Sequence, residues 1–473
     1  MNYEAALTIG GMKHSGEAPS LDVVDPASGQ VFAQCPGTSV AQLDQAVASA
    51  KTAFGHWQHT PESDVRAMLH EIAGRIEANA SELAHMVVQE QGKPLALAEM
   101  EVGAAVAWTR YTADLDIPVK VIEDSETRLA ELHRKPLGVV GSITPWNWPL
   151  MIAVWHIMPA LRTRNTVVIK PAPLTPFSTL RMVELINEVV PPGVVNSVTG
   201  DVEIGEAMST HPGISKMVFT GSTPTGKAIM RGASDTLKRL TLELGGNDAG
   251  IVLDDADLDE IAGAIFQTSF LNMGQTCAAL KRLYVHDSLY EDLVQRLATM
   301  AREQGVGSGF DAANSFGPVQ NLKQLRYIEE LVSDARENGA RIVCGGERMP
   351  GEGFFYPPTI VADISDGTRL VDEEQFGPVL PVIRYTDIEE VMVRANDNPN
   401  GLGGSIWGRD LERARALAMK LETGTAWINN HAEVLPHCPF GGCKMSGIGV
   451  EFGEEGLLEY TTAQLVSMNR GGG

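Results

Sequence analysis

Cysteine is scarce in this chain, and the few cysteines do not form pairs. The sequence has five of them in 473 residues, an odd number, and none lies in a CxxC motif: Cys35, Cys277, Cys344, Cys438 and Cys443. This pattern excludes a disulfide framework and a cysteine-based zinc site, and no metal site is predicted. It is typical of proteins of the reducing cytoplasm, which is the location that we expect.

Positive charge and long apolar runs are also lacking. Lys and Arg number 37 against 60 Asp and Glu, which gives a net charge of −23. Nucleic acids and anionic membranes bind clustered cations, so we expect neither as a partner. No run of 18 apolar residues and no signal-peptide pattern at residues 1–5 is present, so no membrane helix is predicted. With 44% hydrophobic and 21% charged residues, the chain is expected to fold into two or three globular domains.

Hydrophobic periodicity predicts a largely helical first part. Two short strands are expected within residues 21–32, followed by helices at about 40–51, 61–91 and 96–113. Residues 117–135 read as a hairpin around Asp124-Ser125-Glu126 that lies outside the helix–strand alternation. Such a protruding hairpin is a candidate for subunit pairing through its exposed edge.

Buried strands followed by polar or glycine-rich turns dominate the middle of the chain. They are expected at residues 138–143, 166–171, 217–220 and 241–244, and their alternation with helices predicts a doubly wound parallel sheet. Lys170 and the Gly221-Ser222 turn come at the carboxyl ends of strands, where such sheets bind ligands. Strand, glycine turn and helix amino end together favour a bound phosphate, although the turn is not a GxGxxG motif.

A second α/β region is predicted after Gly246. It comprises a helix capped by acidic residues and ending at Phe270, a strand at 282–286 and a helix at 289–304. The glycine-rich stretch 305–317 is interpreted as a loop. Further strands are expected after the charged loop at 372–378 and before Asn429-Asn430, and residues 459–468 are expected to form a last strand.

Two reactive side chains stand out. Glu243 ends an apolar strand, and Cys277 follows it by 34 positions, after a Gly-Gln turn. A single buried cysteine is usually a small core residue. A thiol together with a carboxylate, however, suggests covalent catalysis, in which the thiolate attacks a carbon and the carboxylate later activates water.

The motifs together resemble the aldehyde dehydrogenase superfamily, in order and spacing, from about Val23 to Thr462. They are Pro145-Trp146-Asn147-Trp148-Pro149, Lys170-Pro171, Phe219-Thr220-Gly221-Ser222, Leu242-Glu243-Leu244-Gly245-Gly246, Gly274-Gln275-Thr276-Cys277, Glu374-Gln375-Phe376-Gly377-Pro378 and Pro439-Phe440-Gly441-Gly442. The resemblance implies an α/β fold with a Rossmann-like NAD(P)-binding domain (1–117, 137–245 and 446–458) and a catalytic domain (246–445). It also implies an oligomerisation element (118–136 and 459–473), and a homodimer or homotetramer in which the tail strand pairs with a neighbour.

The resemblance also implies a mechanism. Cys277 attacks the aldehyde, the Asn147 amide and the Cys277 N–H stabilise the oxyanion, hydride leaves for NAD or NADP, and Glu243 activates the water that hydrolyses the thioester. Glu451 matches a position that relays protons from the general base. We expect the site to lower the pKa of the Cys277 thiol.

Cofactor and substrate residues follow by resemblance. Glu374 is expected to hold the nicotinamide ribose, Lys170 the adenosine ribose and Ser222 a phosphate oxygen. The full cofactor set is Thr144, Pro145, Trp146, Lys170, Pro173, Gly221, Ser222, Gly245, Glu374 and Phe376. The expected substrate pocket is apolar and is lined by Trp148, Ile152, Trp155, Leu271, Thr276 and Val434.

The chain departs from the family pattern at several positions. Pro173 replaces a glutamate that members preferring NAD often carry, so the preference between NAD and NADP stays open. His156 replaces a lysine near the proton-exit route, and we predict an altered pH–rate profile. Arg162 and Arg164 flank Thr163 where glycine is common, without an explanation from sequence. His431 and His437, near the substrate entrance, either contact a polar group or are solvated.

The expected activity is oxidation of an aldehyde to its acid. The absence of an arginine in the expected pocket favours an aromatic or medium-size apolar aldehyde over a semialdehyde, which remains an alternative. A CoA-acylating enzyme is disfavoured because Glu243 is present. A thiol hydrolase or acyltransferase is the alternative from a different class, and it would need no dinucleotide.

Overall fold

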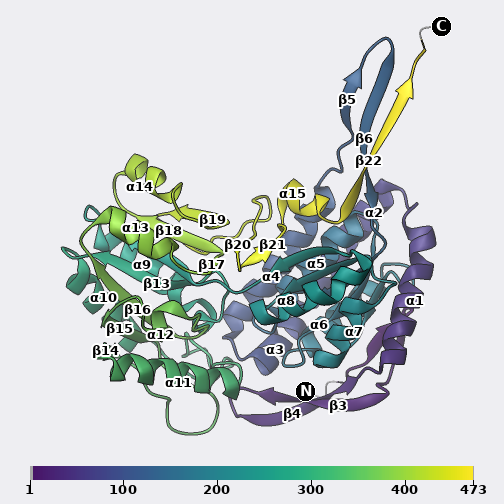
Figure 1. Cartoon of the computed structure of the whole chain (residues 1–473). Coiled ribbons are helices and arrows are strands. Elements are labelled where there is room, and N and C mark those ends of the chain that lie inside the picture. The colour runs from purple at the N-terminus through teal and green to yellow at the C-terminus, as the bar shows by residue number, and fades with distance from the viewer. Residues whose placement is uncertain (1–3, 472–473) are drawn as a thin grey trace.

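Two mixed sheets form the body of the molecule (Figure 1). The computed structural model describes residues 4–471. The first sheet has the strand order β2-β1-β9-β8-β7-β10-β11-β21. Its five middle strands are mutually parallel, as predicted, whereas β1, β2 and β21 join antiparallel. The strands are β1 (Leu7–Ile9), β2 (Met12–His14), β7 (Val139–Ile143), β8 (Thr166–Lys170), β9 (Val195–Ser197), β10 (Lys216–Thr220), β11 (Arg239–Glu243) and β21 (Gly447–Ile448).

Helices cover both faces of this sheet because its strands are apolar on both sides. Alternate residues such as Val140 and Val167 pack into a core with helices on one face, and their neighbours Val139 and Val168 pack into a core on the other. The first face carries α2 (Glu62–Ala78), α3 (Ala80–Gln91), α4 (Leu95–Asp114), α5 (Pro149–Arg162) and α6 (Phe177–Asn187); the second carries α1 (Val40–Trp57), α7 (Val202–Thr210) and α8 (Thr223–Ala233).

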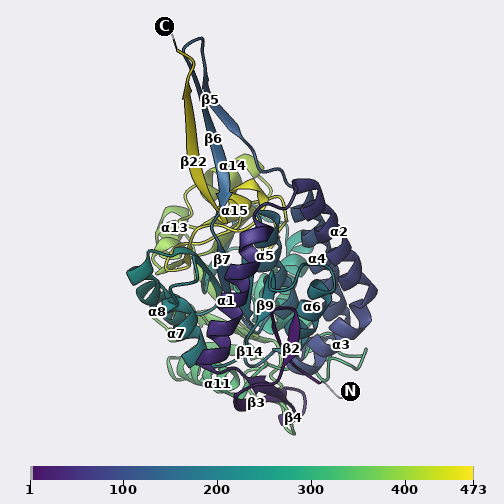
Figure 2. The ribbon, with the colours of Figure 1, turned by 90° about the vertical axis from the view of Figure 1, so that its right-hand side faces the viewer.

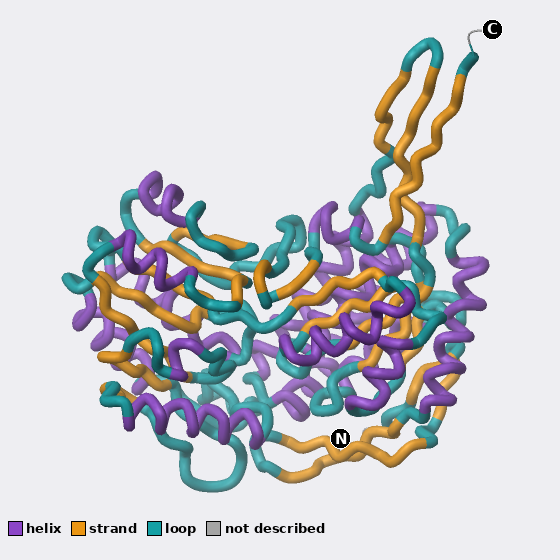
Figure 3. Tube along the Cα trace, viewed as in Figure 1, coloured by secondary structure: helices purple, strands orange, loops and turns teal. Residues whose placement is uncertain are grey.

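The second sheet has seven strands in the order β14-β15-β16-β13-β12-β18-β19. The strands are β12 (Asp248–Val252), β13 (Leu280–His286), β14 (Arg341–Cys344), β15 (Thr359–Ile364), β16 (Val379–Tyr385), β18 (Gly403–Trp407) and β19 (Thr425–Ile428). The helices of this part are α9 (Leu258–Phe270), α10 (Tyr290–Arg302), α11 (Leu322–Glu337), α12 (Arg369–Asp372), α13 (Ile388–Asn396) and α14 (Leu411–Ala418). Figure 3 shows strands flanked by helices in this half as well.

Three strands project from the body as a narrow arm. In this arm β6 (Arg128–Pro136) lies between β5 (Lys120–Asp124) and the carboxyl-terminal β22 (Thr461–Asn469), all antiparallel. Figures 1 and 2 show the arm extending well beyond the two sheets. The predicted hairpin and last strand are therefore present, and the tail pairs with the hairpin of its own chain.

The remaining short elements connect these parts. They are β3 (Ala18–Asp25), β4 (Gln30–Gly37), η1 (Ser234–Thr236), η2 (Leu271–Gly274), β17 (Asn400–Gly401), β20 (Cys443–Lys444) and α15 (Gly453–Leu458). β3 and β4 form the antiparallel pair expected within residues 21–32. Ser39 caps α1 through a capping box, and residues 305–317 form a loop as predicted, with one isolated bridge between Val306 and Phe316.

One predicted helix is wrong in its extent. The helix expected over residues 61–91 is two helices, α2 and α3, which meet at Asn79. Asn79 leaves helical geometry with φ −110° and ψ 18°, and its side-chain amide donates to the Arg75 carbonyl. Asparagine competes for backbone groups in this way more readily than the apolar residues around it, so the helix breaks there.

Across residues 4–471, every helix is too short or too polar to cross a membrane. The two sheets take up the strands that we assigned to the cofactor and catalytic domains, and β21 returns to the first sheet. The exact domain boundaries stay a prediction.

Candidate active site

One cavity of about 230 Å³ brings most of the predicted site together. Cys277 is half-buried and opens into it, so the sulfur does not lie in a sealed interior. The carboxyl ends of β7, β10 and β11 border the cavity on one side, and residues of the second half of the chain border it on the other. The residues that line it are Pro145, Trp146, Asn147, Thr220, Gly221, Ser222, Glu243, Leu244, Gly245, Cys277, Gln324, Glu374 and Phe376.

A left-handed turn delivers Cys277 to the cavity. Asn272, Met273 and Gly274 have φ values of 51°, 60° and 69°, a rare run for residues with side chains. Only glycine fits at position 274, because a Cβ there would lie 2.2 Å from the Gly377 carbonyl oxygen. The turn ends α9 abruptly and points the following residues back toward β7.

Asn147 lies directly beside this turn. Its side-chain Nδ2 donates to the Gln275 carbonyl at 2.9 Å, which leaves the second N–H of the amide for another acceptor. The next residue, Trp148, donates from Nε1 to the Thr276 hydroxyl at 3.1 Å. Two side-chain donors therefore join the loop after β7 to the turn before Cys277, which fixes the position of the Asn147 amide as an oxyanion site would need.

Glu243 is an almost fully buried carboxyl group at the end of β11. Neither of its carboxylate oxygens has a hydrogen-bond partner within residues 4–471. Burial, and secondly the charge of Glu451, raises the pKa of Glu243 well above its usual range. A carboxyl group with a raised pKa that lines the same cavity as a thiol is a stronger proton acceptor than an ordinary glutamate.

The pKa of Cys277 contradicts the expectation from sequence. The pKa of Cys277 is raised to about 12. Burial is the largest cause; the charges of Glu243 and Glu374 also raise the pKa, whereas Lys281 lowers it. The expected lowering fails because the thiol is surrounded by apolar groups and carboxylates, and a single ammonium group does not outweigh them. That ammonium group donates to the Thr276 and Cys277 carbonyls and lies 3.1 Å from Glu374 Oε1.

The other end of the cavity fits a nicotinamide dinucleotide. Ser222 precedes α8 without forming a side-chain cap, so the first N–H groups of the helix are free to bind a phosphate. Glu374 accepts from the Gly246 N–H at 3.1 Å and presents a carboxylate suited to ribose hydroxyls. A Cβ at Gly245 would lie 2.2 Å from Glu374 Oε2, so a larger residue there would displace this carboxylate, and Trp146 packs edge-on against Phe376.

Three predicted cofactor residues lie outside this cavity. Thr144 follows β7, and its N–H donates to the Lys170 carbonyl at 3.2 Å. Lys170 is buried and donates to the Gly200 carbonyl at 2.9 Å, and burial lowers its pKa to about 8. Pro173 follows in the loop after β8 and is half-buried. Their roles as cofactor residues stay predictions.

His156 and Glu451 meet behind Glu243. His156 lies on α5, is fully buried, and pairs with the hydroxyls of Ser142 and Thr220 at 2.8 and 3.1 Å. Its Nε2 is 3.3 Å from Glu451 Oε1. Because Thr220 is the register partner of Glu243, these groups form a continuous polar layer on one face of the first sheet. This arrangement supports a proton path, and the predicted effect of His156 on the pH profile stays a prediction.

The predicted substrate residues form an apolar wall beside the thiol. Trp148, Ile152 and Trp155 are buried in one cluster, and Leu271, Val434 and Cys277 pack against it. Thr276 contributes its hydroxyl to the Trp148 indole. The two indoles of the cluster present flat apolar surfaces, and within residues 4–471 no arginine lines the cavity at Cys277 or a larger cavity beside Leu271.

The two histidines near this wall behave differently. His431 is buried, pairs with Ser405 Oγ at 2.9 Å and lies 3.5 Å from Asp248 Oδ2, so the alternative that it is solvated is wrong. His437 is exposed, with its ring 6.4 Å from that of Tyr111. The long-range contact with Asp248 is invisible in the sequence.

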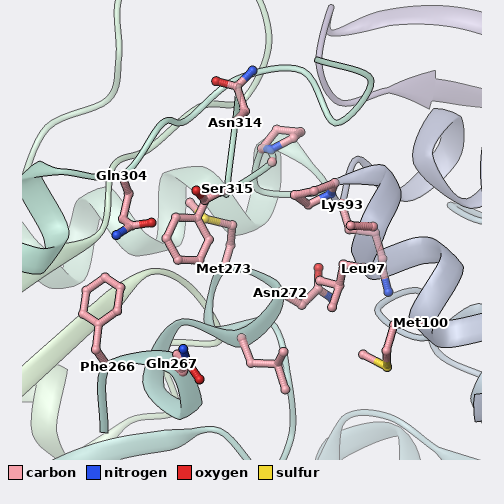
Figure 4. Close-up of a pocket in the computed structure, with 16 residues that line it drawn as sticks. Lys93, Leu97, Met100, Phe266, Gln267, Asn272, Met273, Gln304, Asn314 and Ser315 are labelled. Carbon is pink, nitrogen blue, oxygen red and sulfur yellow. The ribbon is translucent and has the colours of Figure 1, made fainter. Parts of the chain in front are cut away.

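A second cavity of about 530 Å³, shown in Figure 4, has Leu271 among its lining residues. Leu97, Met100 and Phe266 give it an apolar wall, and Asn272 and Lys93 also belong to it. Leu97 and Leu271 pack against the cluster around Cys277 as well, so the cavity adjoins the substrate wall.

Sequence reasoning missed several buried polar residues at the site. No role is predicted for Lys281, which precedes the strand expected at 282–286, and Lys93 and Glu101 are interpreted as scaffold. A charged residue such as Lys281 inside an apolar strand is an available signal, because a buried charge needs partners. Its partners, however, come from distant parts of the chain.

Comparison with known proteins agrees with this geometry. The model of the aldehyde dehydrogenase family matches residues 13–466. Phenylacetaldehyde dehydrogenase of Pseudomonas fluorescens is 40% identical over 475 residues, which cover 97% of this chain and 94% of the relative. The NAD+ complex of an aldehyde dehydrogenase from Bacillus cereus is 36% identical with a TM-score of 0.96, covering 98% of this chain and 96% of that one. An NADP-dependent enzyme of E. coli is 33% identical with a TM-score of 0.96, covering 99% and 98%.

The matches extend over nearly the whole chain and confirm the α/β fold, the oxidation of an aldehyde and the use of NAD or NADP. The cavity unites a thiol, a carboxyl group and groups suited to a dinucleotide, which is the combination that this chemistry requires. This chain belongs to the aldehyde dehydrogenase family.

Proposed function

We propose that this enzyme oxidises an aromatic or medium-size apolar aldehyde through a thioester on Cys277. The observation that carries the proposal is that Cys277, Asn147 and Glu243 line one cavity with Gly221 and Glu374. The thiol and the base thus share a space with the groups suited to a dinucleotide.

In the first half of the reaction, the Cys277 sulfur forms a bond to the carbonyl carbon. The carbonyl oxygen becomes an oxyanion that accepts hydrogen bonds from the free N–H of Asn147 and the Cys277 N–H. Because the pKa of Cys277 is high, the thiol needs a base, and Glu243 takes its proton. The bound nicotinamide supplies the acceptor for the hydride, whose departure with its electron pair leaves a thioester.

In the second half, water attacks the thioester carbon. Glu243, which by then has passed the thiol proton to Glu451 and His156, takes a proton from the water, the C–S bond breaks, and the thiolate leaves as the carboxylic acid forms. Glu451 and His156 then carry protons from Glu243, because they lie in the polar layer behind it. Glu374 and the amino end of α8 at Ser222 hold the dinucleotide across the cavity.

The substrate class follows from the apolar wall. Trp148, Trp155 and Leu271 suit an aromatic ring, and the larger cavity that Leu271 lines offers room for a larger body. The name of the Pseudomonas relative, a phenylacetaldehyde dehydrogenase, supports the same class. A semialdehyde is disfavoured because its carboxylate would meet no arginine in this wall.

Rapid-mixing kinetics of Glu243→Gln test the mechanism. The variant should form one equivalent of reduced dinucleotide per site, more slowly than the wild type because Glu243 also takes the thiol proton, and then turn over at least about 100-fold more slowly than the wild type. Cys277→Ala, the matched control, should give no burst. A Glu243→Gln variant that keeps full steady-state turnover would show that another group activates water.

A substrate screen tests the specificity. We expect kcat/KM to be highest for phenylacetaldehyde or a similar apolar aldehyde and at least about tenfold lower for succinic semialdehyde, measured with NAD and NADP in parallel. The same measurements give the preference between NAD and NADP, which Pro173 leaves open in the sequence. Equal or higher kcat/KM for the semialdehyde would reject the apolar class, and thioester hydrolysis without any aldehyde oxidation would favour a thiol hydrolase.

We further propose that the enzyme is a cytoplasmic homodimer or homotetramer assembled through the arm. The arm exposes apolar side chains on its strands, among them Val121, Ile122, Leu465 and Met468. β22 lies at the edge of its sheet with its outer side unpaired within residues 4–471, so a strand of a neighbour can add there.

A further inference from the structure

We propose that Lys93 and Glu101 form a buried positioning pair that holds the Asn147 amide in place for the oxyanion. The inference rests on the proposed function, in which Asn147 stabilises the oxyanion formed at Cys277. It adds two residues, from α4 and the loop before it, that the reaction scheme does not use.

Lys93 reaches the backbone of Asn147. Its Nζ donates to the Asn147 carbonyl oxygen at 2.8 Å and to Glu101 Oε2 at 2.6 Å, and it lies 3.6 Å from the centre of the Trp148 ring. Both charged side chains are fully buried. Two of these three partners of the Lys93 ammonium group belong to the loop that carries Asn147. The third is the Glu101 carboxylate, which balances its charge.

Glu101 anchors the other end of the same loop. Its Oε1 accepts from the N–H groups of Leu150 at 2.9 Å and Met151 at 3.2 Å, in the first turn of α5. A carboxylate at a helix amino end is stabilised by the helix dipole and by N–H groups that lack a partner within the helix. The Lys93–Glu101 ion pair therefore binds the chain at the Asn147 carbonyl and, from Leu150 onward, at the start of α5.

Asn272 supplies a second donor to the same carbonyl. Its Nδ2 is 3.0 Å from the Asn147 oxygen, and Asn272 belongs to the left-handed turn that delivers Cys277. Figure 4 shows Lys93 and Asn272 on the wall of the larger cavity, from different elements. The Asn147 carbonyl is thus held by two donors while its side chain donates to Gln275, so the amide has little freedom to turn away from the sulfur.

A buried ion pair costs desolvation energy, so we expect to find one here only if the position of the loop matters. Two charges removed from water are often replaceable by apolar residues without loss of stability. An apolar pair, however, would leave the Asn147 carbonyl with one donor fewer and α5 without its acceptor. A displacement of a catalytic donor by a fraction of an ångström is enough to slow a reaction.

The test compares two reactions of Cys277. Acylation by p-nitrophenyl acetate passes through an oxyanion, whereas alkylation by iodoacetamide does not. For Lys93→Met, and for Lys93→Met with Glu101→Gln, we expect the acylation rate to fall about 10- to 100-fold and the alkylation rate to change less than about twofold. Lys93→Arg, which keeps a cationic donor, should recover part of the acylation rate.

Lys216→Met is the matched control. Lys216 is another fully buried lysine near the first sheet; it donates to Thr241 and does not contact Asn147. It should leave the ratio of acylation to alkylation unchanged. If Lys93→Met does not fold, as judged by circular dichroism, Glu101→Gln carries the test, with an expected fall of about 3- to 10-fold in the same ratio.

The Asn147→Ala background separates the two proposals. If Lys93 acts through Asn147, Lys93→Met should cause no further loss of acylation there. An equal loss in both backgrounds, or a parallel fall of acylation and alkylation, would overturn the positioning role. If Asn147→Ala itself leaves acylation unchanged, the proposed oxyanion role of Asn147 fails; if it slows acylation while Lys93→Met does not, only the inference about Lys93 fails.

Discussion

Glu243 and Glu451 are two buried carboxyl groups, and their electrostatic interaction affects the pH at which Glu243 loses its proton and can act as a base. Burial and the charge of Glu451 raise the pKa of Glu243. A base must be deprotonated to activate water, so the rate of thioester hydrolysis should rise with pH through the pKa of Glu243. The acidic limb of the profile therefore lies above the ordinary glutamate value of 4.5.

Glu451→Gln tests this interaction. Removing the repelling charge lowers the pKa of Glu243, so the acidic limb of the deacylation rate should move to lower pH. The plateau should fall, because the proton path loses a member. Single-turnover deacylation measured from pH 5 to 9 gives both quantities, and a limb that stays in place or moves upward would contradict the interaction.

Arg162 and Arg164, which the sequence left unexplained, have opposite effects on stability. Arg162 is almost fully buried, donates to the Leu115 carbonyl and pairs with Glu62, so it fastens the end of α5 to the segment before the arm. Arg164 has a left-handed φ of 63°, and its buried Nε has no partner within residues 4–471. The family glycine suits such a conformation without strain.

Arg164→Gly should therefore stabilise the protein by about 0.5–1 kcal/mol, because the left-handed strain of about 1–2 kcal/mol outweighs the entropy cost of glycine. Thermal unfolding should show a higher midpoint. Arg162→Ala is the control with the opposite sign, since it breaks a buried hydrogen-bonded pair. A lower midpoint for Arg164→Gly would mean that the packing of the arginine stem matters more than the backbone strain.

Among the elements, the arm is the part whose exposed surface calls for a partner. β22 is paired along one side with β6 from Thr461↔Pro136 to Asn469↔Arg128, while Leu465 and Met468 are 60% and 54% exposed. An edge strand with exposed apolar residues pairs readily with another chain.

Leu465→Glu combined with Met468→Glu should shift the assembly toward monomers, because it places like charges on the edge strands of two neighbours. Sedimentation velocity at several concentrations measures the shift. Ser467→Glu, which adds one charge on the same strand without removing an apolar side chain, should cause a smaller shift. An unchanged mass for the double variant would place the subunit interface elsewhere.

At the scale of the whole molecule, the dinucleotide edge is built from both halves of the chain. Gly221 and Ser222 follow β10 of the first sheet, and Glu374 and Phe376 come from the part that contains the second sheet. A ligand that binds both halves stabilises the folded state by about 2.7 kcal/mol at 100 times its Kd.

Saturating NAD or NADP should therefore raise the thermal midpoint and slow proteolysis between the halves. Glu374→Ala should reduce this protection, because it removes the contact from the second half and leaves the first intact. Differential scanning fluorimetry against dinucleotide concentration measures the effect. Full protection of Glu374→Ala at the same concentrations would show that the first half alone binds the cofactor.

The sequence by itself determined the family, the main alternation of strands and helices, and the candidate nucleophile and base. These follow from local patterns: apolar strands of period two, turns at their carboxyl ends, and reactive residues within short motifs such as Leu242–Gly246 and Gly274–Cys277. Such patterns depend only on residues that are close in the sequence, so a single sequence is enough to identify them.

Only the tertiary structure decided the environment of those residues. The pKa of Cys277 is raised because distant carboxylates and apolar groups surround it, and His431 is buried because Asp248 and Ser405 lie behind it. Lys93 and Asn272 meet at one carbonyl although 179 positions separate them along the chain. Charge, burial and hydrogen bonding depend on which residues the fold brings together, and no local pattern records that.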